Sequence, residues 1–346
     1  MRTIYWEDNA VKLIDQTLLP DVFKVITCRT VDELADAIKR LAVRGAPALE
    51  ASGAYGVALA CFERDFKDAE ELKEYVKKRA ELLASTRPTA VNLFYGIERV
   101  LKVVLSGNDV EEIRKIALEE AEKIAEEDVK RNKLMGKYGA ELLEDGDTVL
   151  TYCNTGRLAT VDYGTALGVI RSAVEQGKRI KVIACETRPL NQGSRLTCWE
   201  LMQDGIDVTL ITDNMVGIVM QKGMVDKVIV GADRIVRDAV FNKIGTYTVA
   251  IVAKEHNVPF YVAAPITTFD WEKTMNDVVI EERSKEELIY CHIKCRKTLI
   301  APKDVKIFNP AFDATPLKYV TALITEKGII YPPYEENVPK FLNLSR

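Results

Sequence analysis

The feature that most constrains this 346-residue sequence is a series of five short β-branched runs in its second half. They follow Asp145-Gly146-Asp147, alternate with helical segments, and cover residues 148–152, 180–184, 208–211, 228–230 and 260–263. Short strands that alternate with helices are typical of βαβ units, which build a parallel sheet. The sequence therefore predicts an α/β fold with a parallel-sheet domain over residues 141–346.

The first 140 residues have a different pattern, which is mainly helical. Short strands are expected over residues 4–6 and 11–16, and Thr30-Val31-Asp32-Glu33 is a capping box before an amphipathic run that Gly45 and Pro47 end. Further helices are expected over residues 48–62, 70–84, 90–105 and 110–135, the last being rich in Lys and Glu like a solvated face. We expect a mainly helical N-terminal domain over residues 1–140 with a small β element at its start.

The composition excludes several classes of protein. The 48 basic and 52 acidic side chains leave a net charge of −4, so no global positive field attracts nucleic acid. No stretch approaches the roughly 20 apolar residues that span a membrane. Seven cysteines without a CxxC pair, and no signal-peptide pattern after Met1, predict reduced thiols in a cytoplasmic protein.

Metal and nucleotide sites are also disfavoured. There are only two histidines, and Cys291-His292-Ile293-Lys294-Cys295 has unusual spacing for zinc and no fourth ligand nearby. Neither a GxGxxG nor a Walker A sequence occurs. We therefore expect no metal and no cofactor.

Polar residues follow the predicted strands, at the edge where open parallel sheets bind ligands. Cys153 ends the first run and enters a glycine-containing loop before a helix near residue 165, where a thiol can act as nucleophile or base. Asp233 follows the fourth run and could act as general acid or base if partly desolvated. The alternatives are a buried structural cysteine, and a helix cap or a salt bridge from Asp233 to Arg234.

Three basic segments predict a phosphate pocket. Arg44-Gly45-Ala46-Pro47 and Arg87-Pro88-Thr89 each place a guanidinium before a helix N-terminus, and Asn242-Lys243 precedes another helix. Helix N-termini and bidentate arginines both bind phosphate, although a single arginine at such a place is more often solvated. The repetition of the arrangement favours a ligand that carries phosphate.

The sequence resembles the methylthioribose-1-phosphate isomerase family, in the superfamily that also contains ribose-1,5-bisphosphate isomerase and the regulatory subunits of translation initiation factor 2B. The resemblance covers nearly the whole chain. It is carried by VRGAPALEASGAYGVALA (43–60), RPTAVNLFYGIERV (87–100), LTYCNTGRLATVDYGTALGVIRSA (150–173), ETRPLNQGSRLTCWEL (186–201), TDNMVGIVM (212–220), VIVGADRI (228–235), NKIGTYTVAIVAKEHNVPFYVAAP (242–265) and NPAFDATP (309–316).

The resemblance implies an aldose–ketose isomerase that forms 5-methylthioribulose 1-phosphate in methionine salvage, with a Rossmann-like C-terminal domain and a homodimeric assembly. It implies that Asp233 is the proton donor and Cys153 its catalytic partner. By the same resemblance, the phosphorylated sugar is held by Arg44, Gly45, Ala46, Arg87, Gln192, Asn242 and Lys243. Two alternatives remain open, a ribose-1,5-bisphosphate isomerase and a non-catalytic subunit related to initiation factor 2B.

The sequence departs from the family pattern near the predicted catalytic cysteine. Tyr152 stands where the family often has His, and Cys185 stands where it often has Asp. The segment from Arg234 to Asn242 is about one residue shorter than the family pattern, and Arg157 adds a cation to the cysteine loop. A second phosphate on the substrate would need such an additional cation.

Overall fold

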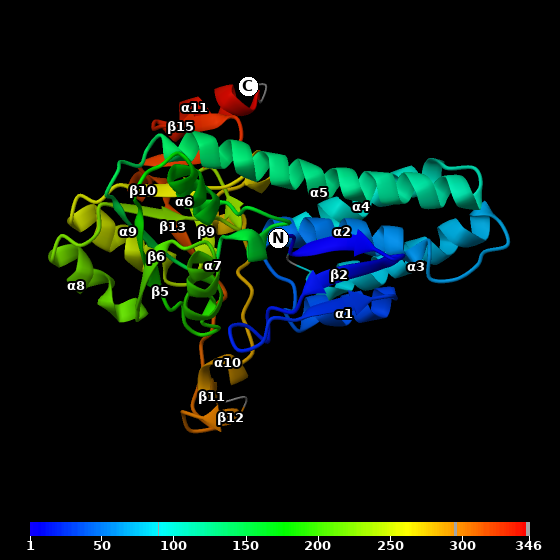
Figure 1. Ribbon diagram of the computed structural model, residues 1–346, viewed down its shortest axis with the longest axis horizontal. Coiled ribbons are helices and arrows are strands. Elements are labelled where there is room, and N and C mark those ends of the chain that lie inside the picture. Colours follow the sequence, from blue (N-terminus) through cyan, green and yellow to red (C-terminus); the bar gives the residue numbers. More distant parts are fainter. Residues whose placement is uncertain (89, 294–295, 344–346) are drawn as a thin grey trace. The chain divides into compact units, whose positions relative to one another are not determined.

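The structure is a computed structural model that describes residues 1–88, 90–293 and 296–343 (Figure 1). It divides into two compact units. Unit 1 comprises Met1–Leu142, Asn154–Gly177 and Thr325–Gly328, and unit 2 comprises Leu143–Cys153, Lys178–Ile324 and Ile329–Arg346. The predicted domain division after residue 140 stays a prediction.

Unit 1 begins with the expected small β element and continues with helices. Its antiparallel strands are β1 (Ile4–Glu7), β2 (Ala10–Ile14) and β3 (Val25–Cys28). Its helices are α1 (Val31–Lys39), α2 (Ala46–Ala60), α3 (Ala69–Thr86), α4 (Val91–Ser106), α5 (Val110–Ala140) and α6 (Ala166–Glu175), and η1 (Arg157–Ala159) is a 3₁₀ turn. The predicted Thr30–Glu33 capping box begins α1.

The core of unit 1 is built around α2, whose residues are almost all buried. Small residues let the neighbouring helix approach closely: a Cβ at Gly96 of α4 would lie 2.0 Å from the Glu50 carbonyl oxygen of α2. Helix α5 buries Ile113, Ala117 and Ala121 at helical spacing. Its Lys and Glu side chains lie mainly on the exposed face, as expected, and the buried face is an addition to that expectation.

Unit 2 contains the predicted parallel sheet. The sheet order is β15-β14-β10-β7-β4-β5-β6, and the pairs from β14 to β6 are parallel. The five expected runs are β4 (Thr148–Thr151), β5 (Lys181–Cys185), β6 (Asp207–Ile211), β7 (Lys227–Val230) and β10 (Phe260–Ala263). The α/β fold class is confirmed, and β14 (Ala322–Thr325) and β15 (Gly328–Ile330) extend the sheet beyond the expectation.

Further elements surround this sheet. Strands β8 (Arg234–Ile235), β9 (Ala239–Lys243) and β13 (Phe312–Pro316) form a second, antiparallel sheet. A hairpin of β11 (Tyr290–Ile293) and β12 (Arg296–Leu299) lies beside α10 (Glu286–Ile289). The remaining helices are α7 (Cys198–Gln203), α8 (Val216–Gln221), α9 (Thr246–Glu255) and α11 (Tyr334–Leu342), with a π-helical turn, η2 (Gly193–Thr197), and the 3₁₀ turns η3 (Asp213–Met215), η4 (Ile266–Thr268), η5 (Met275–Asp277) and η6 (Leu317–Tyr319).

Two general properties of the described residues bear on the sequence predictions. Among the described residues, six cysteines form no disulfide, namely Cys28, Cys61, Cys153, Cys185, Cys198 and Cys291. Within the described ranges, every helix is too short or too polar to cross a membrane.

Candidate active site

Cys153 lies immediately after β4, in a conformation that its neighbours hold in place. Its φ is +67°, in the left-handed region that costs a residue with a Cβ about 1–2 kcal/mol. Its backbone N–H donates to Thr187 Oγ1 at 2.9 Å, and its carbonyl accepts from Thr197 Oγ1 at 2.7 Å. The residue is 8% exposed, so its position is set by buried hydrogen bonds.

The loop after β5 supplies those two threonines and is itself anchored. The backbone N–H groups of Thr187 and Arg188 donate to the two carboxylate oxygens of Asp213, each at 2.7 Å. The predicted ligand Gln192 is buried in this loop, and a Cβ on the following Gly193 would lie 1.7 Å from the Cys185 carbonyl oxygen. The loop therefore packs directly on the end of β5 and places Gln192 near that edge.

Asp233 leaves the same edge of the sheet as Cys153. Strands β4 and β7 are adjacent and parallel, with Leu150 opposite Val228, so both chains leave the sheet side by side. The Asp233 N–H donates to the Phe241 carbonyl at 2.9 Å, which ties this loop to β9. The alternative for Asp233 is a salt bridge to Arg234. Arg234 forms an ion pair with a different carboxylate, that of Asp270, at 3.4 Å.

Asn242 and Lys243 follow Phe241 on β9, close to the Asp233 loop. Asn242 is buried and donates to Thr246 Oγ1 at 3.0 Å. The Lys243 ammonium donates to the Ala311 carbonyl at 3.0 Å. The structure thus brings Cys153, Asp233, Gln192, Asn242 and Lys243 to one edge of the unit 2 sheet.

The N-terminus of α9, which follows the predicted ligands Asn242 and Lys243, is capped by a carboxylate. The carboxylate of Asp313 already accepts hydrogen bonds from the N–H groups of Gly245 at 2.7 Å and Tyr247 at 3.1 Å. A second anion cannot use the same donors. The sequence reasoning missed Asp313, although it lies within the quoted NPAFDATP segment.

Tyr152, the first departure from the family pattern, packs against the loop before α9. A Cβ at Gly245 would lie 2.1 Å from the Tyr152 hydroxyl oxygen, and Gly245 has a φ of +104°. Burial raises the pKa of the Tyr152 hydroxyl well above its usual value. The side chain is therefore a neutral phenol that shapes the site beside Cys153.

In unit 1, Arg44 contacts the residue that follows Cys153 in the chain. Its guanidinium donates to the Asn154 carbonyl at 2.7 Å and to Asn154 Oδ1 at 3.2 Å. Gly45 has a φ of +98°, and a Cβ there would lie 2.3 Å from the Ala159 carbonyl oxygen. The Arg44-Gly45-Ala46 segment therefore fits closely against the cysteine loop.

Helix α2 begins at Ala46 with an N-terminus suited to an anion. Among the described residues, its first turn contains no acidic side chain and its N-cap, Gly45, makes no side-chain hydrogen bond. Backbone N–H groups at such an end, together with the helix dipole, favour a phosphate. The N-cap of α2 supplies no side-chain acceptor, whereas Asp313 accepts from two N-terminal N–H groups of α9.

Arg87, a predicted phosphate ligand, and Arg157, the additional cation of the cysteine loop, have different surroundings. Arg87 ends α3, and its carbonyl accepts from the Ala90 N–H at 3.0 Å; Thr89 of the predicted Arg87-Pro88-Thr89 segment lies outside the described residues. Arg157 lies 3.6 Å from Asp162 in the same loop, with 15% of its side chain exposed. The charge of Arg157 is therefore matched within the cysteine loop.

A buried polar cluster that the sequence reasoning missed supports this loop. Asp128 of α5 accepts from the Val161 N–H at 2.8 Å and from Asn132 Nδ2 at 3.0 Å, and Arg131 lies 3.1 Å from Glu50 of α2. Burial raises the pKa of Asp128 to about 7, with Arg131 and the backbone hydrogen bond opposing this. The cluster connects α2 and α5 to the loop that follows Cys153.

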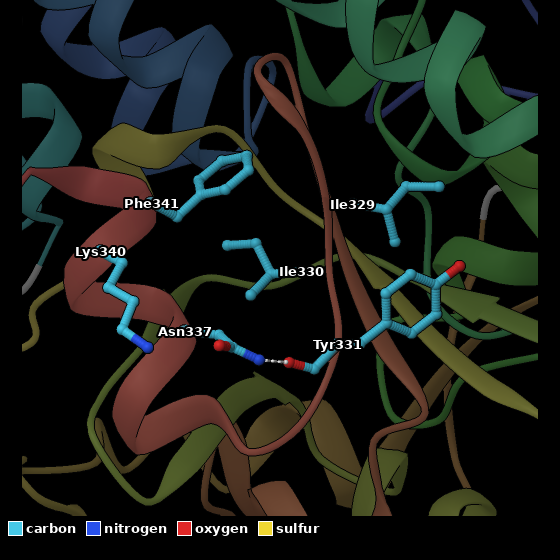
Figure 2. Close-up of a pocket in the computed structure, with 6 residues that line it drawn as sticks. All are labelled: Ile329, Ile330, Tyr331, Asn337, Lys340 and Phe341. Carbon is cyan, nitrogen blue, oxygen red and sulfur yellow. Dashed lines mark hydrogen bonds between the residues drawn. The ribbon is translucent and has the colours of Figure 1, made fainter.

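The described residues contain no group of three or more His, Cys, Asp and Glu side chains that could hold a metal ion, and Lys294 and Cys295 of the cysteine-histidine cluster lie outside them. A cavity of about 410 Å³ lies between β15 and α11 (Figure 2) and is lined by Ile329, Ile330, Tyr331, Asn337, Lys340 and Phe341. Lys340 is the one cation among these lining residues, and none of the predicted site residues lies among them.

Comparison with known proteins agrees with the resemblance read from the sequence. A methylthioribose-1-phosphate isomerase of Thermosipho melanesiensis is 54% identical over 340 residues, covering 98% of this chain and 97% of that protein. The crystal structure of 5-methylthioribose 1-phosphate isomerase from Pyrococcus horikoshii has a TM-score of 0.93 and 46% identity, covering 99% of this chain and 96% of that one. A crystal structure from Archaeoglobus fulgidus, described as translation initiation factor eIF-2B subunit delta, has a TM-score of 0.92 and 75% identity, covering 99% of this chain and 100% of that one.

The family assignment rests on a match that covers most of the sequence. The model of the initiation factor 2 subunit family matches residues 42–332, from the start of the predicted phosphate segment to beyond the last strand of the parallel sheet. This confirms the predicted superfamily. The chain belongs to the initiation factor 2 subunit family.

Proposed function

We propose that this chain is an aldose–ketose isomerase that converts 5-methylthioribose 1-phosphate to 5-methylthioribulose 1-phosphate in methionine salvage. The observation that carries the proposal is that Cys153 and Asp233 follow two adjacent parallel strands, β4 and β7, at the same edge of the sheet. The relatives that bear this isomerase name, at 46% and 54% identity over nearly the whole chain, support the same substrate.

The substrate explains why two catalytic groups are needed. A phosphate on C1 replaces the free anomeric hydroxyl, so the sugar ring does not open spontaneously. In the proposed mechanism, Asp233 protonates the ring oxygen and the bond from C1 to that oxygen breaks, which leaves a cation at C1. General acid catalysis of this kind contributes about 10²–10⁴-fold to a rate.

Cys153 then completes the isomerisation. As a thiolate it removes the proton from C2, the electron pair forms the C1–C2 double bond of an enediol-like state, and the proton is delivered to C1. The C2 hydroxyl gives its proton to the Asp233 carboxylate and becomes the ketone, so the product is a ketose 1-phosphate and both catalytic groups return to their starting forms. In the alternative, the hydrogen of C2 moves to C1 as a hydride, and Cys153 only stabilises the charge.

The phosphate group would be held by the remaining predicted ligands. Arg44 and the N-terminus of α2, with Gly45 and Ala46, offer a guanidinium and backbone N–H groups. Lys243 adds an ammonium group at the sheet edge of unit 2. Arg87, Gln192 and Asn242 complete the proposed set.

Substitution of the two catalytic groups tests the proposal. Cys153→Ala and Asp233→Asn should each lower kcat by at least about 100-fold while substrate binding is largely kept. Cys198→Ala is a matched control, because burial raises the pKa of that thiol to about 11 and it should be inert. Turnover by either catalytic variant at the rate of the control variant would refute the assignment, and washout of deuterium from C2 would reject the hydride route.

A second candidate function has one observation in its favour. The Archaeoglobus fulgidus structure at 75% identity is described as a translation initiation factor subunit. A regulatory subunit of that kind would have no need to keep Cys153, Asp233 and the proposed phosphate ligands together. Co-purification with initiation factor 2, combined with no turnover of any pentose 1-phosphate, would favour the subunit over the isomerase.

The remaining expectations belong to the same proposal. A ribose-1,5-bisphosphate isomerase would need a cation for a second phosphate, and the pairing of Arg157 with Asp162 argues against Arg157 in that role. We expect a cytoplasmic homodimer that needs no nucleic acid, membrane or cofactor. Analytical ultracentrifugation of the purified protein tests the dimer.

A further inference from the structure

Strand β13 holds the Asn242-Lys243 segment from one side. In the antiparallel pairing of β13 with β9, Phe312 lies opposite Lys243 and Asp313 opposite Asn242. The Lys243 ammonium donates to the Ala311 carbonyl at 3.0 Å and lies 4.9 Å from the centre of the Phe312 ring. Three consecutive residues, Ala311 just before β13 and Phe312 and Asp313 within it, therefore lie along the predicted phosphate ligands.

The third of these residues, Asp313, closes the N-terminus of α9. The N-cap of α9 is Gly245, which has no side chain that could accept from the first N–H groups of the helix. Asp313 performs this role from another strand, at 2.7 Å from the Gly245 nitrogen and 3.1 Å from the Tyr247 nitrogen. A carboxylate thus occupies a place that would otherwise attract phosphate.

The surroundings of Asp313 make its charge dependent on pH in an accessible range. Burial raises the pKa of Asp313 to about 6, while the two backbone hydrogen bonds and Lys243 oppose the rise. The charged and titratable groups that face it are Lys243 of β9, Tyr247 of α9 and Tyr152 after β4. Both tyrosines have a raised pKa and stay neutral at the pH values used below.

We propose that Asp313 is a positioning residue of the phosphate site, which excludes the anion from the N-terminus of α9 and leaves it to the Lys243 ammonium. The inference rests on the proposed function, because it takes Lys243 as a phosphate ligand. Asp313 does not touch the reacting carbons. It acts through the placement of the anion.

Sulfate is the probe for this proposal, since it carries the same charge from pH 5 to pH 8 and needs no turnover. Binding to the whole protein is measured by isothermal titration calorimetry for the wild type, Asp313→Asn and Asp109→Asn. Asp109 is a matched control, because it caps α5 through the Glu112 nitrogen at 2.9 Å in the same manner. Loss of one negative charge a few ångströms from the anion should tighten sulfate binding by about three- to tenfold at pH 8 in Asp313→Asn.

The expected pattern separates a positioning role from a merely structural one. Sulfate should bind the wild type more tightly at pH 5.5 than at pH 8. In Asp313→Asn, this pH dependence should weaken and kcat for the sugar phosphate should fall. Asp109→Asn keeps a side-chain oxygen that caps a helix well, so it should keep the wild-type sulfate affinity and most of its thermal stability. Unchanged or weaker sulfate binding by Asp313→Asn overturns the proposal; if that variant does not fold, wild-type sulfate affinity that is constant between pH 5.5 and pH 8 overturns it.

The same experiment distinguishes failure of this inference from failure of the proposed function. If the wild type does not convert the sugar phosphate but Asp313→Asn still binds sulfate more tightly, only the proposed reaction is wrong. If the wild type is active and Asp313→Asn behaves like Asp109→Asn in sulfate binding, only the role of Asp313 is wrong.

Discussion

Gly45→Ala is the substitution with the sharpest structural consequence in the predicted phosphate segment. Gly45 has a φ of +98°, and its new Cβ would lie 2.3 Å from the carbonyl oxygen and 2.6 Å from the Cα of Ala159. These are backbone atoms of the cysteine loop, so no side-chain rotation relieves the overlap. Either the start of α2 or the loop must move.

The size of that movement follows from the distances. Favourable contacts between non-bonded atoms lie near 3.5 Å, so the two segments must separate by about 1 Å. A displacement of about 1 Å at a binding site can cost roughly 100-fold in rate. With a ψ of 140°, Gly45 lies in a region that is essentially restricted to glycine, which adds on the order of 1–3 kcal/mol of backbone strain for alanine.

Gly146→Ala provides the matched control for the backbone strain alone. Gly146 has a φ of +96°, almost the same as Gly45, but a Cβ there meets nothing within 4 Å. This variant should lose about 1–2 kcal/mol of unfolding free energy and keep its catalytic constants. Gly45→Ala should lose more stability and, in addition, about 100-fold in kcat/KM.

Urea unfolding and steady-state kinetics on 5-methylthioribose 1-phosphate measure the two effects. The reasoning predicts that the variants differ most in kcat/KM, because only Gly45 packs against the loop after Cys153. Equal kcat/KM values for Gly45→Ala and Gly146→Ala would refute the claim that this close approach positions the site.

Two further predictions concern charged groups of unit 1. Burial raises the folded-state pKa of Asp128 to about 7 from an ordinary value near 3.8. The protonated side chain therefore contributes fully to the free energy of unfolding below pH 4, and this contribution is lost as the pH rises through 7. The free energy of unfolding of Asp128→Asn, taken relative to that of the wild type, should therefore increase by on the order of a few kcal/mol from pH 4 to pH 8. Urea titrations at several pH values measure this difference. A difference that stays constant with pH contradicts the prediction. Arg157→Ala should lower the melting temperature, because the ion pair with Asp162 is lost. The ratio of turnover on 5-methylthioribose 1-phosphate to turnover on ribose 1,5-bisphosphate should stay unchanged. A loss of turnover on the bisphosphate alone would instead identify Arg157 as a phosphate ligand.

The parallel sheet could be predicted because its strands carry a strong local signal. Each of the five runs is β-branched and lies between helical segments, and all five are adjacent in the observed sheet. Strand β14 was not predicted, since ALIT is a short apolar run whose pairing with β10 depends on tertiary contacts. The buried face of α5 escaped notice because small alanines such as Ala117 and Ala121 give a weak apolar pattern among many charged residues.

The site was predictable to the extent that it lies at strand ends. Cys153 and Asp233 follow predicted strands, and a parallel sheet brings such residues to one edge. Asp313 and Asp128 act on segments far along the chain, with 68 residues between Asp313 and Gly245 and 33 between Asp128 and Val161 in the numbering. No local pattern marks a carboxylate that accepts a distant backbone N–H, so only the folded structure identifies them.

Two of the departures from the family pattern, Tyr152 and Cys185, are compatible with the proposed chemistry, because both lie at packing positions. Cys185 contacts Gly193 through its carbonyl oxygen, an atom that every residue type provides, and its own thiol has a pKa raised by burial. Tyr152 places its ring where only a glycine at 245 leaves room. The substitutions therefore change the wall beside Cys153 and α9, while Cys153, Asn242 and Lys243 have the hydrogen bonds described above.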